Sequence, residues 1–203
     1  MSRRAEPAEA GPAGVVRVAV VAGRDHRVRA RRALAEALAI PAAELELDHD
    51  AQGRPVITRP RTSTVVSIAH APDLTLVAFA PHGDVGVDVE PLDRNVLGWA
   101  LWRHVLTRRE LERLPSVPRE RNAALLRLWV RKEALLKAVG TGIAVEPSGI
   151  ELTEDGEVVV LPPRHGAIED WALHDVEIPG CAAAVACRPV ASGSRVEVVA
   201  TTA

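Results

Sequence analysis

Apolar positions in the first half of the chain follow two different periods. A β-branched run at residues 15–21 predicts a buried strand, and the pattern at residues 25–38 predicts a helix that ends before Pro41. Three further apolar runs predict strands at residues 65–69, 74–80 and 85–89. Because only short turns separate these three runs, we expect an antiparallel meander.

The second half of the chain repeats this order of elements. Its opening segment, residues 94–121, is polar and rich in arginine, with helical stretches broken by Pro115 and Pro118. Residues 122–139 form the clearest helix in the sequence, closed by the glycine turn at residues 140–142. Strands are predicted at residues 149–153, 158–161, 171–178 and 182–188. A strand, a helix and three strands thus occur twice, which indicates an α+β fold.

Composition argues against several classes of protein. The formal net charge of −2 is unfavourable for a protein whose main partner is nucleic acid. No apolar run approaches the roughly 18 residues of a membrane span, and residues 1–14 lack a signal-peptide core. We therefore expect a flexible N-terminus at residues 1–14, no membrane partner and a cytoplasmic location. Cys181 and Cys187 are expected to be buried free thiols.

Two carboxylates share one face of a predicted strand. In the run at residues 85–90, valines alternate with Gly86, Asp88 and Glu90, so a strand aims both acidic side chains at one point. A hard cation between them, Mg²⁺ or Ca²⁺, would relieve their repulsion. The alternative is a half-exposed edge strand whose acidic face is solvated. Taken alone, the pattern of this strand favours that alternative.

A polar stripe interrupts the helix at residues 122–139. Trp129, Glu133 and Lys137 follow one another at four-residue steps and therefore lie on one side of the helix. A surface ion pair is the simple explanation, but the surrounding positions are mostly apolar, and charges on a buried helix need partners. His70 ends a predicted strand just before a turn; it is either structural or a donor to a phosphate.

These residues fall within four short motifs of fixed order. The motifs are Gly-Arg-Pro at residues 53–55, Ser-Ile-Ala-His at 67–70, Gly-Val-Asp-Val-Glu at 86–90 and the run from Trp129 to Lys137. In order and spacing they resemble the 4'-phosphopantetheinyl transferases of the surfactin-synthetase-activating (Sfp) type. The resemblance implies a pseudodimer of two similar subdomains, residues 15–93 and 94–203, with coenzyme A bound in the cleft between them.

The family reaction, by the same resemblance, moves the 4'-phosphopantetheine arm of coenzyme A to a serine of an apo acyl or peptidyl carrier protein. Adenosine 3',5'-bisphosphate is released. Asp88, Glu90 and Glu133 would be the ligands of Mg²⁺, which is also held by the coenzyme A pyrophosphate. Glu133, directly or through metal-bound water, would be the base for the carrier serine, and Lys137 would stabilise or protonate the departing phosphate. The implied catalytic residues are therefore Glu133, Lys137 and Asp88.

Other basic residues match positions that contact coenzyme A in the family. His70 corresponds to a histidine that contacts a phosphate. Lys132 would support the phosphate charge or the position of the helix. Arg54 could reach the adenosine 3'-phosphate together with one arginine of residues 24–32, such as Arg31, and the sequence does not choose among those arginines.

The sequence departs from the family pattern at three positions. Ser67 stands where asparagine is common and Ala69 where many members have serine, so one side-chain hydrogen bond to coenzyme A must be missing or replaced. Val89, between the two carboxylates, is apolar and leaves two protein ligands on this strand. None of these changes removes a residue that the chemistry requires.

The arginine-rich segment at residues 94–121 lies between the two acidic motifs along the chain. Since carrier proteins present acidic surfaces beside their serine, we hypothesise that Arg103, Arg108 and Arg109 dock the carrier; added solubility is the alternative. We expect the protein to act as a monomer. Two other functions remain open, a coenzyme A or nucleotide-binding module without activity and a metal-dependent nuclease.

Overall fold

A computed structural model describes residues 15–140, 146–188 and 195–200. The expectations for residues 1–14 and for Thr141 and Gly142 lie outside this part of the chain. The helices and short 3₁₀ turns are α1 (His26–Ala37), α2 (Trp102–Val105), α3 (Arg108–Arg113), α4 (Pro118–Val139), η2 (Pro147–Gly149), η3 (Pro163–His165) and η4 (Ile168–Asp170). The strands are β1 (Val15–Ala22), β2 (Glu46–His49), β3 (Pro55–Arg59), β4 (Val65–Ala71), β5 (Leu74–Ala80), β6 (Asp84–Pro91), β7 (Glu151–Leu152), β8 (Val158–Val160), β9 (Ala172–Asp175), β10 (Cys181–Arg188) and β11 (Arg195–Ala200).

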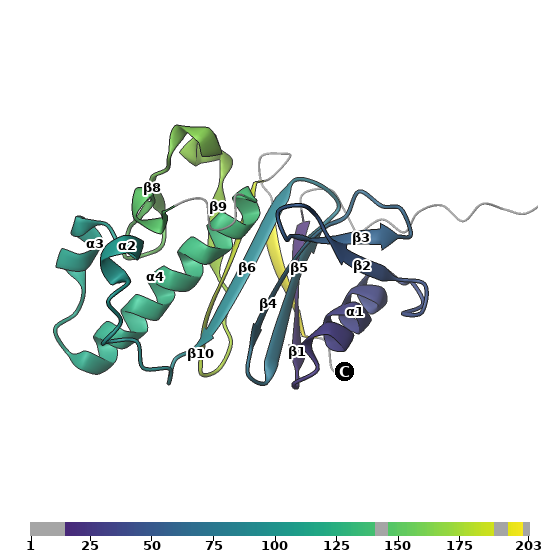
Figure 1. Cartoon of the computed structure of the whole chain (residues 1–203), viewed down its shortest axis with the longest axis horizontal. Helices are drawn as coiled ribbons and strands as arrows, with labels where there is room; N and C mark the ends of the chain where they lie inside the picture. The colour runs from purple at the N-terminus through teal and green to yellow at the C-terminus, as the bar shows by residue number, and fades with distance from the viewer. Residues whose placement is uncertain (1–14, 141–145, 189–194, 201–203) are drawn as a thin grey trace, which may run out of the picture.

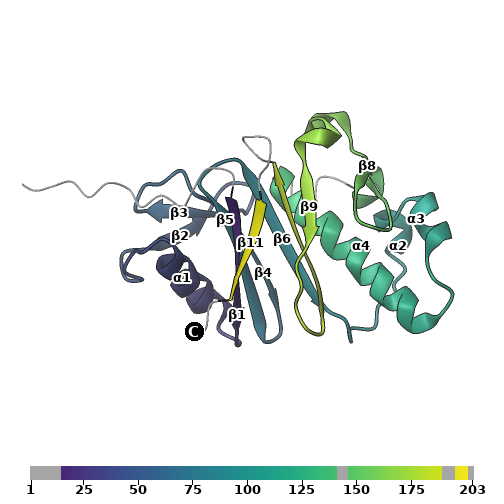
Figure 2. The same ribbon diagram turned by 180° about the vertical axis from the view of Figure 1, so that it is seen from behind.

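Two sheets form the centre of the molecule. One has the strand order β11-β1-β5-β4 and the other the order β6-β10-β9. Valines and alanines of both sheets build a shared core between them, while α1 packs on the other face of the first sheet and α4 on that of the second. Figure 1 shows these layers side by side, with α4 and α1 at opposite sides of the strands, and Figure 2 shows β11 beside β1. The α+β class is confirmed.

The expected three-stranded meander is wrong at its last strand. β4 and β5 pair antiparallel as predicted, but β6 pairs with β10, from Asp84 with Arg188 to Pro91 with Cys181. The reason is that β5 already bonds β1 on one edge and β4 on the other, so no edge remains for β6. The short turn after β5 requires only that β6 begins close to the end of β5.

One side chain links β4 to β6 where the two sheets meet. The backbone N–H of Val87 donates to Ser67 Oγ at 3.1 Å, and Ser67 is buried. This bond satisfies a backbone donor on β6 that has no strand partner on that side. The Ser67 hydroxyl thus helps to hold the strand that carries Asp88 and Glu90.

The strand pairings cross the proposed subdomain boundary at residues 93 and 94 twice. β6 of the first half pairs with β10, and β11 of the second half pairs in parallel with β1. The sequence did not predict β11. The division into two subdomains and the pseudodimer therefore remain a proposal.

Helix α4 begins four residues earlier than predicted. Pro118 occupies its first turn, where a missing N–H is tolerated because that group has no partner inside the helix. Gly140 ends the helix with a φ of 73°, a left-handed conformation that glycine adopts without strain. Of the predicted tail strands, only the one at residues 182–188 has its full length.

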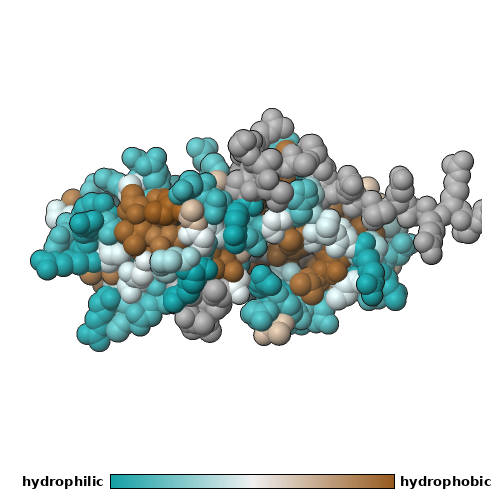
Figure 3. Space-filling model, turned by 90° about the horizontal axis from the view of Figure 1, so that it is seen from above, coloured by the Kyte–Doolittle hydropathy of each residue, from teal (hydrophilic) through white to brown (hydrophobic). Residues whose placement is uncertain are grey.

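Other general expectations can be compared with the described residues. Cys181 and Cys187 are both free; Cys187 is buried, which raises the pKa of its thiol to about 11, whereas Cys181 is half-buried. None of the described helices is long and apolar enough to span a membrane. Seen from above, the surface is largely hydrophilic, with separate hydrophobic areas on the two halves (Figure 3).

Candidate functional site

Helix α4 lies directly against strand β6, and a glycine makes this contact possible. A Cβ atom at Gly86 would lie 2.0 Å from the carbonyl oxygen of Ala134 and 2.4 Å from the backbone nitrogen of Ala138. Any side chain at Gly86 would therefore push α4 away. Because Asp88 and Glu90 follow Gly86 on the same face, the close approach brings both carboxylates toward the helix.

Lys137 and Asp88 form the central contact of the site. The Lys137 ammonium donates to Asp88 Oδ1 at 2.7 Å and to the carbonyl oxygen of Val87 at 3.1 Å. Asp88 is 9% exposed. Burial raises the pKa of Asp88, the Lys137 charge opposes this shift, and the negative charge of Glu90 adds to it. The helix stripe and the acidic strand therefore meet, as the sequence predicted.

Glu133 is the carboxylate of the site that pairs with no side chain among the described residues. It is half-buried, and among the described residues it makes no hydrogen bond or ion pair that would compensate it. Burial raises the pKa of Glu133, the charges of Asp88 and Glu90 raise it further, and Lys137 lowers it. The charges of Asp88 and Glu90 thus act on Glu133, whose pKa is raised as expected of a candidate base.

Glu90 is held by a cation that the sequence reasoning missed. Arg94 Nη1 donates to Glu90 Oε1 at 2.5 Å, and the Arg94 guanidinium lies 4.5 Å from the ring centroid of Trp99. The four-residue spacing of Glu90 and Arg94 could have indicated the pair, but this spacing is informative only in a helix, and the segment is a turn.

The three carboxylates offer oxygen ligands that suit a hard cation, but two of them are engaged by other side chains. Among the described residues, no three His, Cys, Asp or Glu side chains are arranged to hold a metal ion. Lys137 and Arg94 occupy two of the three carboxylates instead. Carboxylate oxygens are nevertheless the ligands that Mg²⁺ prefers. The residues therefore fit Mg²⁺ by their chemistry, provided that these ion pairs rearrange.

A pocket of about 600 Å³ opens beside this cluster. Its wall brings together four parts of the chain: the β2–β3 turn, β4, the α2 region and the C-terminal half of α4. Glu133, Lys137 and Trp129 line it from α4, and Arg54 and Ser67 line it from the first half of the chain. A larger cavity of about 1060 Å³ lies on the opposite flank of α4 and is lined by none of the four site residues.

The remaining candidates from the sequence lie at different distances from this pocket. Arg54 is paired with Asp50 at 2.7 Å and packs against Gly140 at the C-terminus of α4, where a cation is favourable. His70 is exposed at the end of β4, and its ring centroid lies 4.6 Å from that of His26. Arg31 is exposed on α1, outside the pocket lining.

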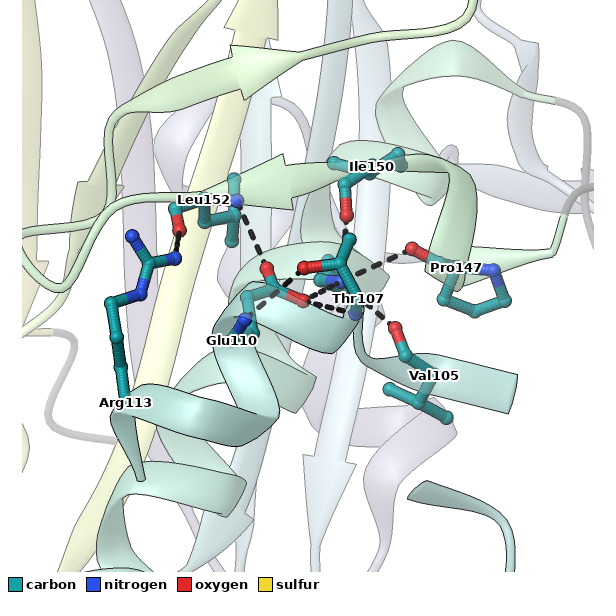
Figure 4. A network of polar contacts seen from close by, with 8 residues as sticks. Val105, Thr107, Glu110, Arg113, Pro147, Ile150 and Leu152 are labelled. Atoms are coloured by element: carbon teal, nitrogen blue, oxygen red, sulfur yellow. Dashed lines mark hydrogen bonds and ion pairs between the residues drawn. The ribbon is translucent and has the colours of Figure 1, made fainter. Parts of the chain in front are cut away.

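Lys132 is the clear correction to the predicted site. Its side chain is 1% exposed, and its ammonium donates to Glu110 Oε2 at 2.6 Å and to the carbonyl oxygens of Val105, Ile150 and Pro147. Figure 4 shows this network, in which Glu110 also accepts from the backbone N–H groups of Thr107 and Leu152. All three protons of the ammonium are engaged inside the protein, so Lys132 cannot contact a coenzyme A phosphate.

The three arginines proposed for carrier docking are all exposed. Arg108 pairs with Glu112 at 2.7 Å, and Arg109 lies 3.7 Å from Glu151. Arg103 donates to the ring of His104, which lines the pocket. Their exposure is compatible with docking, which stays a prediction.

The part of the chain that carries this cluster matches a known protein family. Residues 84–186 match the model of the 4'-phosphopantetheinyl transferase superfamily, a range that contains Asp88, Glu90, Glu133 and Lys137 but neither Arg54 nor His70. The chain is 30% identical over 149 residues to the protein slr0495 of Synechocystis sp., whose name assigns it provisionally to the 4'-phosphopantetheinyl transferases.

Two further relatives carry the same name. The chain is 28% identical over 175 residues to 4'-phosphopantetheinyl transferase psf-1 of Bacillus pumilus and 28% identical over 156 residues to 4'-phosphopantetheinyl transferase HetI of Nostoc sp.. These matches and that of the Synechocystis protein cover 83%, 73% and 72% of this chain, respectively. They span 72%, 63% and 61% of the relatives' own lengths, in the same order.

Proposed function

Because the chain belongs to the 4'-phosphopantetheinyl transferase superfamily, we propose that it transfers the 4'-phosphopantetheine arm of coenzyme A to a serine of an apo carrier protein. Adenosine 3',5'-bisphosphate is the second product. The observation that carries the proposal is the pairing of Lys137 with Asp88 beside Glu133, which lines the 600 Å³ pocket and has no ion-pair partner within the described part of the chain. Such a pocket is large enough for part of a nucleotide-sized ligand.

Mg²⁺ is the proposed cofactor, held by Asp88, Glu90 and Glu133. Bound there, it would neutralise the diphosphate of coenzyme A and stabilise the charge that develops on the leaving phosphate. The support is the hard-oxygen donor set and the closeness of the charges, since Glu90 raises the pKa of Asp88, and both Asp88 and Glu90 raise that of Glu133.

Glu133 is proposed as the base, and Lys137 as the group that assists the departure of adenosine 3',5'-bisphosphate. Glu133 accepts the proton of the carrier serine, whose oxygen forms a bond to the phosphorus that carries the pantetheine arm. The bond from that phosphorus to the oxygen of the 5'-phosphate breaks, and adenosine 3',5'-bisphosphate leaves with the electron pair. Lys137 stabilises this developing negative charge; the support is that it lines the pocket and that its ammonium contacts β6.

Coenzyme A is proposed to bind in the pocket between the two halves, residues 15–93 and 94–203, which we regard as the pseudodimer subdomains. Arg54 lines this pocket and is a candidate for the adenosine 3'-phosphate, with Arg31 as a more distant one. His70 follows Ser67 on β4, in the direction of the Glu90 end of β6, and could reach a phosphate from there. Arg103, Arg108 and Arg109 are proposed to dock the acidic surface of an acyl or peptidyl carrier.

Intact mass of the carrier tests the function directly. The protein is incubated with coenzyme A, Mg²⁺ and several apo carrier proteins, and we expect a gain of one phosphopantetheine per carrier. Glu133→Ala should abolish the gain, whereas Glu120→Ala, an exposed glutamate in the first turn of the same helix, should retain it. Coenzyme A binding without a mass gain on any carrier would instead favour a binding module without activity.

A further inference from the structure

Arg94 is held beside the carboxylate cluster by contacts with Glu90, Trp99 and Asn122. Its guanidinium bonds Glu90 and lies over Trp99, and the Trp99 ring stacks on the buried Trp102 with centroids 5.8 Å apart. Its backbone carbonyl accepts from Asn122 Nδ2 at 2.9 Å, and Asn122 belongs to α4. The loop that carries Arg94 is therefore tied to the same helix that carries Glu133 and Lys137.

The opposite end of β6 carries the same combination of contacts. Arg188 bonds Asp84 at 2.8 Å and lies 4.9 Å from the ring centroid of Trp171. The arginine side chains are equally exposed, 45% for Arg94 and 43% for Arg188. The carboxylates differ in their surroundings, because Glu90 shifts the pKa of both Asp88 and Glu133, whereas Asp84 shifts neither.

We propose that Arg94 is a positioning residue that competes with Mg²⁺ for Glu90, an inference that rests on the magnesium site proposed above. Without metal, the Arg94 charge offsets part of the repulsion among Asp88, Glu90 and Glu133. To hold Mg²⁺, Glu90 would have to exchange Arg94 for the metal, and the cation–π contact with Trp99 would keep the guanidinium close. Arg94 thereby keeps the affinity of the three carboxylates for Mg²⁺ low until the diphosphate of coenzyme A supplies further ligands.

Magnesium affinity of the whole protein tests this competition without measuring turnover. Isothermal titration with Mg²⁺, with and without saturating coenzyme A, is compared for wild type, Arg94→Gln and Arg94→Lys. We expect Arg94→Gln to bind Mg²⁺ about two- to fivefold more tightly, as for the loss of a partly exposed ion pair. Arg94→Lys keeps the charge and should stay close to wild type.

Arg188→Gln is the matched control. It removes the same ion pair and the same aromatic contact from the same strand, but away from the site carboxylates, so its Mg²⁺ affinity should equal that of wild type. Thermal unfolding of all variants in the absence of Mg²⁺ reports whether each is folded. If Arg94→Gln does not fold, Arg94→Ala replaces it in the titration.

Tryptophan fluorescence gives a second readout. The chain has four tryptophans and no tyrosine, so its emission reports on tryptophan surroundings. We expect Mg²⁺ to change the emission of wild type through Trp99, and this change should be lost in Trp99→Phe and in Arg94→Gln.

The possible results separate the two proposals. If wild type binds no Mg²⁺ even with coenzyme A, the proposed magnesium site is wrong, and the proposed role of Arg94 is wrong as well. If wild type binds Mg²⁺ but Arg94→Gln binds it no more tightly, the site stands and the competition is wrong. The same conclusion follows if Arg94→Lys binds as tightly as Arg94→Gln, since charge would then not be the cause.

Discussion

Two lysines on α4, five residues apart, have opposite environments. Lys132 faces α3, the end of α2 and the η2 turn with Ile150 after it, where Glu110 and three carbonyl oxygens surround its ammonium and leave it 1% exposed. Lys137 faces β6 and the pocket, where it bonds Asp88 and one carbonyl oxygen and its side chain stays 34% exposed. One helix therefore carries an enclosed ion pair on one side and an accessible one on the other.

The difference shows what each ion pair can do. An enclosed pair cannot exchange its partner without unfolding its surroundings, because an unpaired charge in that place would be very costly. An accessible pair can exchange a protein partner for a ligand. The Lys132 side thus holds α4 in position, and the Lys137 side, together with Glu133, is free to bind and react.

Replacing Lys132 should have the largest effect on stability. In Lys132→Met the Glu110 carboxylate, itself 2% exposed, remains buried without its cation. We expect a loss of about 3–5 kcal/mol in the free energy of unfolding, as for other broken buried pairs. Urea unfolding followed by circular dichroism measures it, and a loss below about 1 kcal/mol would contradict the enclosed role of Lys132.

A second substitution identifies the cause of that loss. Glu110→Gln in the Lys132→Met background removes the unpaired charge, while an amide oxygen can still accept one of the backbone N–H bonds from Thr107 or Leu152. The double variant should therefore be more stable than Lys132→Met alone. If it is less stable, simple loss of packing explains the first result.

Replacing Lys137 should lower activity strongly and stability less than replacing Lys132 does. We expect Lys137→Met to lower the rate of carrier modification about 100- to 1000-fold, as for the loss of one group that stabilises developing charge. Its free energy of unfolding should fall by about 1–3 kcal/mol, less than for Lys132→Met, because the buried Asp88 loses its cation at a place where the Lys137 side chain is 34% exposed. Initial rates from intact mass and urea unfolding check both expectations, and a rate within fivefold of wild type would remove Lys137 from the proposed mechanism.

The sequence predicted the accessible side of α4 better than the enclosed side. Strand alternation placed Asp88 and Glu90 on one face and helical spacing placed Glu133 with Lys137, and both patterns are local. The partner of β6 was missed because β10 lies about a hundred residues further along the chain. No local pattern shows that β5 has both edges occupied.

Lys132 could have been predicted more accurately. Successive residues on a helix point about 100° apart, so Lys132 and Glu133 cannot both face the same pocket. Thr107 and Glu110 also have the spacing of a capping box, and the structure confirms one there. What the sequence could not show is that Glu110, having capped α3, also receives the Lys132 ammonium, since this contact depends on how α3 packs against α4.

The smallest predicted effect concerns the pH dependence of the accessible side. The pKa of Glu133 is raised in the folded protein, chiefly by burial and then by Asp88 and Glu90, so the folded state holds this proton to a higher pH than the unfolded chain. Its contribution to stability is therefore lost as pH rises from the unfolded pKa through the folded pKa.

Glu133→Gln should remove this loss of stability with rising pH, because the amide does not titrate. In the absence of Mg²⁺ and coenzyme A, the advantage of the variant over wild type should be larger near pH 7 than near pH 4, because the charged carboxylate is the costly form and its population grows with pH. Urea unfolding at both pH values measures the difference, with Glu120→Gln as the exposed control on the same helix. If Glu133→Gln raised the free energy of unfolding equally at both pH values, the Glu133 charge would not be the cause of the gain.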